Sequence, residues 1–350
     1  MKYYLLPERG EFYKVNMHCH TNISDGQHSP EEVKEFYRSR GYSIGAFTDH
    51  EAILPHNELT DDTFLAITAV EVSTNDDWPG GHVHNRCYHM NLYAKNPNAV
   101  SYPVYDSRYL WPEHAINSVS EECSAIKYRR HYSTAGMNDL IKKANDAGFL
   151  VSYNHPVWSL QRYPDYAGLK GIWGVEFYNA GCNRSGYPEN TQAFDDLLHL
   201  NENVFPLATD DAHEQGTCGF GWIQIKAEQL EYGTVMTALE NGDFYASTGP
   251  EIHTLCIEDG IAHIDTRLCI GCGLCTSIAP DVFAMNADGK AEADTDKGAR
   301  RGESAPVARM GETTPVVNAR IVINAEQRQR LYDIANSGTT SSLAASLADA

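Results

Sequence analysis

Short apolar runs alternate with helix-length segments between about residues 15 and 245, and this alternation constrains the fold more than any other feature of the sequence. Strands separated by helices are typical of βαβ units and a parallel sheet. The expected strands are residues 13–17, 43–47, 64–72, 88–93, 149–153, 175–178, 204–208 and 222–225. We therefore predict an α/β fold built on a mainly parallel sheet.

Two of the predicted helices carry clear end signals. Ser29-Pro30-Glu31-Glu32 combines an N-cap, a proline at the first helical position and a capping-box glutamate, and Gly41 ends that helix. A second helix over residues 137–147 ends at Gly148. Residues 95 to 133, in contrast, show no clear period. Connections of this length inside a compact domain usually carry function, so we expect a lid there.

Histidines and carboxylates recur at the ends of the predicted strands. A single His-x-His pair is more often structural, but buried charged groups are costly unless they are paired or coordinate a metal. Alternation along a strand also points residues i and i+2 to the same side. The recurrence at one end of the sheet therefore predicts a metal centre. Its residues are His18, His20, Asp25, Asp49, His50, Glu71, His89, Asn154, His155, Asp211 and His213.

Seven segments together resemble the motif series of the PHP (polymerase and histidinol phosphatase) family over about residues 10 to 252. They are NMHCHTNISDG, FTDH, AVEVST, the strand containing His89, YNHP, TDDAH and FYASTGP. The resemblance implies a distorted (β/α)7 TIM-like barrel that binds two or three divalent metal ions. One departure is Asp210, where many relatives have serine; it either tunes the metals or caps a turn.

The resemblance also implies how the ligands are shared. One ion would be held by His18, His20, Glu71 and Asp211. Glu71 would bridge to a second ion held by His89 and His155. The third ion would be held by Asp25, His50 and His213.

Mixed imidazole and carboxylate ligands suit Zn, Mn or Fe. Two ions close together lower the pKa of a bridging water, while a third binds substrate oxygens. The sequence thus predicts a metal-dependent phosphoesterase that hydrolyses a phosphate monoester or small nucleotide through a metal-activated hydroxide. His50, His213 and Asp211 are the candidate catalytic residues, with His50 or His213 protonating the leaving group. Arg129, Arg130 and His131 are the candidate phosphate-binding residues, and a solvated surface run is the alternative.

Cys269, Cys272 and Cys275 have the C-x2-C-x2-C spacing of an iron–sulfur site. The surrounding segment, IDTRLCIGCGLCTSIAPDVFAMNADGKAEAD, resembles the first half of a single-cluster bacterial ferredoxin. No cysteine follows Cys275, so the fourth thiolate is missing. The cysteines would then hold a [4Fe–4S] cluster with an open or labile iron, hold zinc with another ligand, or assemble no cluster.

Charge narrows the expected partners. The formal net charge is −20, from 47 acidic and 27 basic residues. Such a surface repels phosphate backbones, so we expect no stable nucleic-acid binding and a small phosphorylated substrate bound through local cations. The sequence contains neither the apolar core of a signal peptide nor an apolar run long enough to span a membrane. We expect a cytoplasmic protein without a membrane partner, and a redox partner if the cluster forms.

The composition changes near residue 260. We expect a metallohydrolase barrel over residues 1–260, a small α+β ferredoxin-like segment over 261–325 and a helical or disordered tail over 326–350. Two alternative functions stay open. FYASTGPEI also resembles the family branch with carbaryl-type hydrolases, which implies an amide, ester or carbamate hydrolase. An iron–sulfur electron-transfer protein, in which the barrel is only a scaffold, is the other.

Overall fold

The computed structural model describes residues 2–4, 6–76, 86–110, 118–200, 203–249, 251–252, 254–258, 261–265, 283–285, 291–293 and 321–322. The chain divides into two compact units. One contains Arg9–Ala246 and Val322–Ala325, and the other contains Met1–Glu8, Ser247–Ile321 and Glu326–Ala350. The division near residue 247 lies earlier than the expected boundary at 260. Cys269, Cys272, Cys275 and the tail lie outside the described residues.

A barrel-like sheet forms the core of the larger unit. Its strand order is β15-β10-β9-β2-β3-β4-β5-β6-β7-β8. The last strand returns to β2 through two backbone hydrogen bonds: the Asp211 N–H donates to His18 O and the His20 N–H donates to Ala212 O, both at 2.9 Å. These bonds nearly close the barrel. The strands are β2 (Glu11–Cys19), β3 (Ile44–Phe47), β4 (Leu65–Asn75), β5 (Cys87–Ala94), β6 (Phe149–Tyr153), β7 (Gly174–Asn179), β8 (Phe205–Thr209), β9 (Trp222–Ala227), β10 (Phe244–Ser247) and β15 (Ile321–Val322).

The sheet confirms the expected α/β barrel, but it is less parallel than the strand pattern predicts. β2, β3 and β4 pair in parallel, as do β6, β7 and β8. β5 runs antiparallel to both β4 and β6, and β9 runs antiparallel to β2. The reason is the length of the connections. A parallel crossover needs a dozen or more residues, usually a helix, and no helix is described between β4 and β5 or, beyond one 3-10 turn, between β8 and β9.

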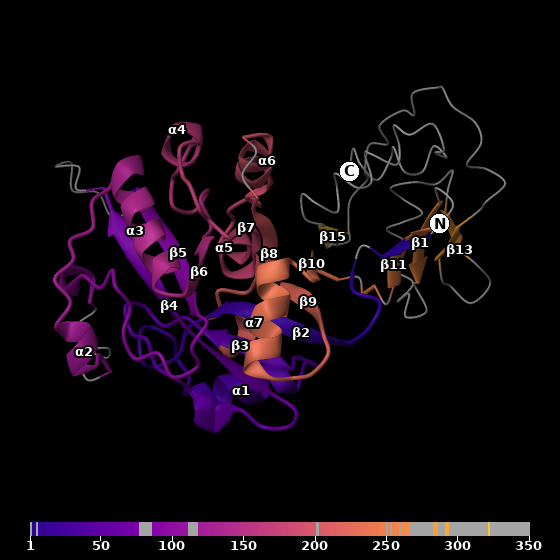
Figure 1. Cartoon of the computed structure of the whole chain (residues 1–350), viewed down its shortest axis with the longest axis horizontal. Helices are drawn as coiled ribbons and strands as arrows, with labels where there is room; N and C mark the ends of the chain where they lie inside the picture. Colours follow the sequence, from indigo (N-terminus) through magenta and orange to yellow (C-terminus); the bar gives the residue numbers. More distant parts are fainter. Residues whose placement is uncertain are drawn as a thin grey trace. The chain divides into compact units, whose positions relative to one another are not determined.

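Helices pack along the strands, as Figure 1 shows for α1, α3, α6 and α7. Ser29 and Glu32 form the expected capping box of α1. α3 begins at Thr134 rather than at 137 because the Ser133 side chain caps it by accepting from the Gly136 N–H. The helices are α1 (Pro30–Arg38), α2 (Glu121–Ser124), α3 (Thr134–Asp146), α4 (Tyr163–Tyr166), α5 (Ala180–Arg184), α6 (Thr191–His199) and α7 (Tyr232–Asn241), with 3-10 turns η1 (Asn57–Leu59), η2 (Ser107–Tyr109) and η4 (Gln215–Thr217).

The smaller unit contains two antiparallel sheets. β1 (Lys2–Tyr4), β11 (Thr254–Glu258) and β12 (Ile261–Asp265) form a three-stranded sheet with β11 in the centre. β13 (Phe283–Met285) pairs with β14 (Ala291–Ala293). Because β1 hydrogen-bonds with β11, the start of the chain belongs to this unit and not to the barrel. None of the described helices combines the length and apolarity needed to cross a membrane.

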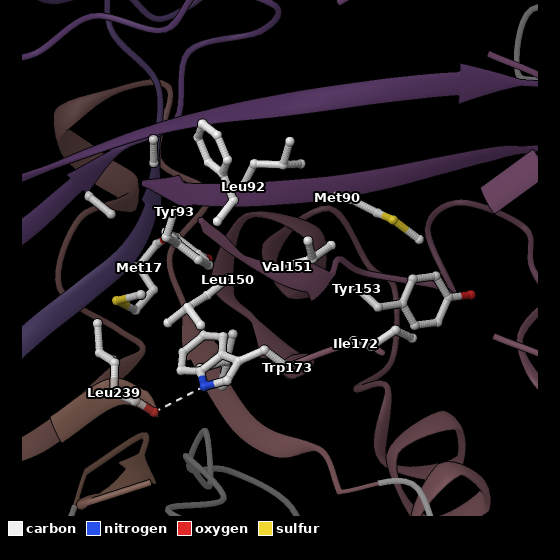
Figure 2. Packing of buried hydrophobic residues seen from close by; sticks show 14 of the residues in the cluster. Met17, Met90, Leu92, Tyr93, Leu150, Val151, Tyr153, Ile172, Trp173 and Leu239 are labelled. Carbon is white, nitrogen blue, oxygen red and sulfur yellow. Dashed lines mark hydrogen bonds between the residues drawn. The ribbon is translucent and has the colours of Figure 1, made fainter. Parts of the chain in front are cut away.

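Trp173 lies in the main hydrophobic core of the barrel unit. Its ring packs against Tyr93, Phe205 and Phe244, with centroids 5.8, 6.0 and 5.9 Å away. Its indole N–H donates to Leu239 O at 2.9 Å, which ties β7's leading residues to α7 (Figure 2). This packing fixes the base of the strands whose other ends carry the histidines and carboxylates.

We expect Trp173→Ala to lower the free energy of unfolding by about 3–5 kcal/mol, because it removes a large buried ring and leaves a cavity. Guanidinium unfolding of the barrel, followed by circular dichroism, measures the change. Tyr163→Ala is the matched control, since Tyr163 is 50% exposed, and it should change stability by less than about 0.5 kcal/mol. Equal stability of the two variants would contradict this packing.

Candidate metal centre

All nine predicted ligands lie in one cluster at the ends of the barrel strands. The path of β2 prepares this arrangement. Between Asn16 and Cys19 its pairing with β3 shifts register, which is a β-bulge. Bulges re-aim side chains and are common beside active sites. His18 lies inside this bulge, and the Nε2 atoms of His18 and His20 are 3.1 Å apart.

Four donor atoms in the cluster are spaced like the corners of a tetrahedron. His18 Nε2 lies 3.4 Å from Glu71 Oε2 and 3.3 Å from Asp211 Oδ1. His20 Nε2 lies 3.4 and 3.1 Å from the same two oxygens. Nitrogen and oxygen ligands about 2.0–2.1 Å from one tetrahedral ion are separated by about 3.3–3.4 Å. The donor spacing therefore fits a single divalent cation at the centre.

Glu71 faces two groups of histidines with its two oxygens. Oε2 is the oxygen near His18 and His20, while Oε1 lies 3.1 Å from His89 Nδ1 and 3.3 Å from His155 Nε2. Asn154 Nδ2 also donates to Oε1, at 2.9 Å, and so fixes the plane of the carboxylate. This arrangement suits a carboxylate that bridges two ions.

The third set of ligands is the most open to solvent. The side chains of Asp25 and His213 are 25% and 38% exposed, and Asp25 Oδ2 lies 3.2 Å from His213 Nε2. His50 Nε2 lies 3.7 Å from the same oxygen. His20 completes this group, whose donor atoms all lie within 4.8 Å of one another. His20 thus stands between two groups, which the sequence did not predict.

Several histidines are held by one ring nitrogen so that the other faces the cluster. His18 Nδ1 contacts Glu176 Oε1 at 2.6 Å, His155 Nδ1 contacts Ser159 Oγ at 3.2 Å, and His213 Nδ1 contacts Asp211 O at 3.0 Å. In a neutral ring, a nitrogen that donates outward leaves the other nitrogen with a lone pair. Such outer partners orient metal-binding histidines in proteins.

The pKa values of the cluster follow from its buried carboxylates. Burial opposes protonation of His20, but hydrogen bonds with Asp211 and Glu71 raise its pKa to about 10. Burial lowers the pKa of His50 to about 3, so His50 is neutral at neutral pH. Neutral His50 and the Nδ1-anchored His213 suit ligand roles better than the role of proton donor. The cluster as a whole requires positive charge, which protons or a divalent cation can supply.

Glu176 is the functional residue that sequence reasoning missed. It is completely buried in β7. Besides His18, it accepts hydrogen bonds from Thr209 Oγ1 at 2.9 Å, the His155 N–H at 3.2 Å and Asn179 Nδ2 at 2.9 Å. A single glutamate inside the apolar run GVEFYN was the available signal, because an unpartnered carboxylate there would be very costly.

Two further aspartates order the loops that carry ligands. Asp49 accepts from the Thr21 N–H and hydroxyl and from the Ser24 hydroxyl, each at 2.8 Å, which shapes the loop ahead of Asp25. Asp210 accepts from the backbone N–H groups of residues 219, 220 and 221 at 2.6–2.8 Å. Of the two roles expected for Asp210, these bonds favour capping a turn.

Strained backbone is concentrated near the cluster. Among the described residues, the non-glycine residues with positive φ are Glu51, His155, Leu160 and Asp211, at 60°, 25°, 57° and 51°. Two of them are candidate ligands and Glu51 follows a third. Such conformations persist where surrounding contacts impose them, and they often mark functional sites.

The candidate phosphate-binding residues are placed differently from the ligands. Arg129 and His131 are exposed. Arg130 is buried, and both ends of its guanidinium contact Glu51, at 2.6 and 2.7 Å. The prediction that Arg130 offers a free cation to phosphate therefore needs correction, because Glu51 already neutralises it. The same contact fixes the connection that we expected to be a lid.

Comparison with known proteins finds both resemblances again. Residues 264–305 match the family model of the 4Fe-4S single cluster domain of Ferredoxin I. A ferredoxin from Thermococcus litoralis is 63% identical over 30 residues, which are 9% of this chain and 51% of that protein. A 5'-3' exoribonuclease from Haemophilus influenzae is 35% identical over 75 residues, 20% of this chain and 27% of that protein. The chain thus spans about half of one relative and about a quarter of the other.

Among solved structures, a two-domain protein from Bacteroides vulgatus that contains a predicted PHP-like metal-dependent phosphoesterase is similar to this chain. The TM-score is 0.43 at 18% identity, covering 69% of this chain and 66% of that one. Likeness at this level does not assign a chemistry, which rests on the side chains described above.

We expect Glu176→Gln to weaken zinc binding about 10–100-fold, the usual effect of losing an outer partner of a metal-binding histidine. The glutamine amide places N–H groups where the His155 N–H and Asn179 Nδ2 need an acceptor. Equilibrium dialysis with zinc measures the affinity. Glu11→Gln is the control, because Glu11 is exposed on β2. Unchanged zinc affinity in Glu176→Gln would show that this carboxylate does not orient the ligands.

Proposed function

We propose that this chain is a metal-dependent phosphoesterase that hydrolyses a phosphate monoester or small nucleotide. The observation that carries the proposal is the tetrahedral spacing of His18, His20, Glu71 and Asp211, with donor atoms 3.1–3.4 Å apart. His89 and His155 on the far oxygen of Glu71 provide for a second ion. His50, Asp25 and His213 provide for a third.

Divalent cations bound at such sites lower the pKa of water and supply hydroxide at neutral pH. The protein's own residues set where this happens. Glu71 and Asp211 neutralise the cations, and Glu176 and Asn154 keep the ligands in place. Asp25 and His213, the most exposed ligands, mark the side from which substrate enters. The arrangement needs no protein nucleophile.

Charge favours an anionic substrate only when cations are present. The cluster contains the carboxylates of Asp25, Glu71, Glu176 and Asp211, which repel phosphate. Two or three divalent ions would reverse this local charge and bind phosphate oxygens. The exoribonuclease relative is named for cleaving phosphodiester bonds, and we extend that chemistry to a small phosphorylated substrate here.

Turnover of two model substrates tests the reaction class. The chain loaded with zinc, manganese or iron should hydrolyse p-nitrophenyl phosphate, and the chelator-treated chain should not, because the attacking group needs the cation. A naphthyl carbamate is the comparison substrate. Cleavage of the carbamate alone would assign the amide, ester or carbamate hydrolase instead of the phosphoesterase.

Replacing ligands tests the residues. His20→Ala and Asp211→Ala should each reduce phosphatase activity more than about 1,000-fold, since each removes a ligand of the proposed central ion. Circular dichroism should show a folded barrel in both. Thr217→Ala, on an exposed 3-10 turn after His213, is the control and should keep activity. Full activity in the double variant His20→Ala/Asp211→Ala would contradict the assignment.

The ferredoxin match supports a second candidate activity, electron transfer by a cluster on Cys269, Cys272 and Cys275. Elemental analysis separates the two candidates in one preparation. Acid-labile sulfide that disappears in Cys272→Ser would show that a cluster assembles at these cysteines. Iron without sulfide, retained in Cys272→Ser, would instead place the iron in the barrel.

A further inference from the structure

A fully buried ion pair lies next to the proposed metal centre without contributing a ligand. The Arg130 guanidinium and the Glu51 carboxylate are 0% and 1% exposed. Their two contacts, at 2.6 and 2.7 Å, are bidentate. Arg130 is brought to Glu51 from a distant part of the chain, and the pair would be costly to bury without further hydrogen bonds.

Those further bonds join the two segments that carry metal ligands. Glu51 follows His50, and its backbone N–H donates to Glu71 O at 3.0 Å. The Ser73 N–H donates to Glu51 Oε1 at 3.0 Å. Arg130 Nη1 donates to Ser73 O at 2.8 Å. The ion pair therefore fixes the turn after β3 to the end of β4.

Ser73 extends this connection to a third ligand. Its hydroxyl lies 3.3 Å from His89 Nε2, the ring nitrogen that faces away from Glu71. The group His50, Glu71 and His89 has donor atoms within 4.8 Å of one another. Each member of this group is thus attached, through backbone or through Ser73, to the Arg130–Glu51 pair.

The other side of the pair is anchored in the long connection between β5 and α3. The Tyr102 hydroxyl donates to Glu51 Oε2 at 2.8 Å, and Arg130 Nε donates to Val104 O at 2.9 Å. The Arg130 N–H donates to Asp106 Oδ2 at 2.9 Å. With these bonds, the described part of the connection supports the cluster from behind.

We propose that Arg130 is a positioning residue that, through Glu51, holds His50, Glu71 and His89 in the geometry of one metal site. The inference rests on the proposed function, because it assumes that the cluster binds cations. It predicts selectivity: the pair should matter more for the ion at His50, Glu71 and His89 than for the ion at His18, His20 and Asp211. The left-handed backbone of Glu51, with φ 60°, is consistent with a turn held in place for this purpose.

Two variants separate positioning from simple stabilisation. Glu51→Leu/Arg130→Met removes both charges together, which usually preserves stability because no buried charge is left unpaired. Arg130→Lys keeps the charge but loses the planar fork that reaches Glu51 and Ser73 together. Arg38→Gln is the control, since Arg38 forms an exposed pair with Glu35 on α1.

Zinc binding is measured on the full chain by equilibrium dialysis, and thermal unfolding is followed in parallel. Residual cluster metal is excluded by repeating each titration in the Cys272→Ser background. We expect both variants to fold, to keep the tightest zinc site, and to bind a further zinc about 10–100-fold more weakly than the unmodified chain. Arg38→Gln should match the unmodified chain.

Unchanged affinity at every site in a folded Glu51→Leu/Arg130→Met variant would overturn the proposal and leave the pair a purely structural role. Equal weakening of all sites in both variants would also overturn it, because the predicted selectivity would be absent. Failure of the unmodified chain to bind zinc, manganese or iron in the barrel would instead contradict the proposed function itself.

Discussion

The organisation of the barrel depends on one buried carboxylate, that of Glu71. It is 1% exposed and is surrounded by imidazoles from distant parts of the chain. A buried carboxylate is stable only with positive charge and hydrogen bonds around it. Strands that are far apart in sequence converge on Glu71 to provide both. Its Oε2 faces His18, His20 and His50, and its Oε1 faces His89 and His155.

The fold satisfies this requirement by giving each imidazole two contacts with different purposes. One ring nitrogen is fixed by an outer partner, such as Glu176 for His18 or Ser159 for His155. The other nitrogen faces the centre. The outer partners are themselves fixed by hydrogen bonds, as Glu176 is by Thr209. Rigid orientation of this kind favours cation binding, because little has to be reorganised when the cation enters.

The sequence predicts the inner ligands well because each belongs to a short local pattern at a strand end. His-x-His on β2 needs only strand alternation to bring both rings to one side. The outer partners could not be predicted in this way. Glu176 is a single residue in an apolar strand, and the partner of Arg130 lies far away on another segment, so Arg130 read as a free cation. The antiparallel course of β5 was missed because hydrophobic pattern does not encode strand direction.

The central claim is that donor atoms from distant strands share one cation. X-ray anomalous scattering from crystals of the full chain grown with zinc tests it most directly, with data collected on both sides of the zinc absorption edge. The account predicts an anomalous peak about 2.0–2.2 Å from His18 Nε2, His20 Nε2, Glu71 Oε2 and Asp211 Oδ1. A saturated crystal with no peak among these four atoms would contradict it.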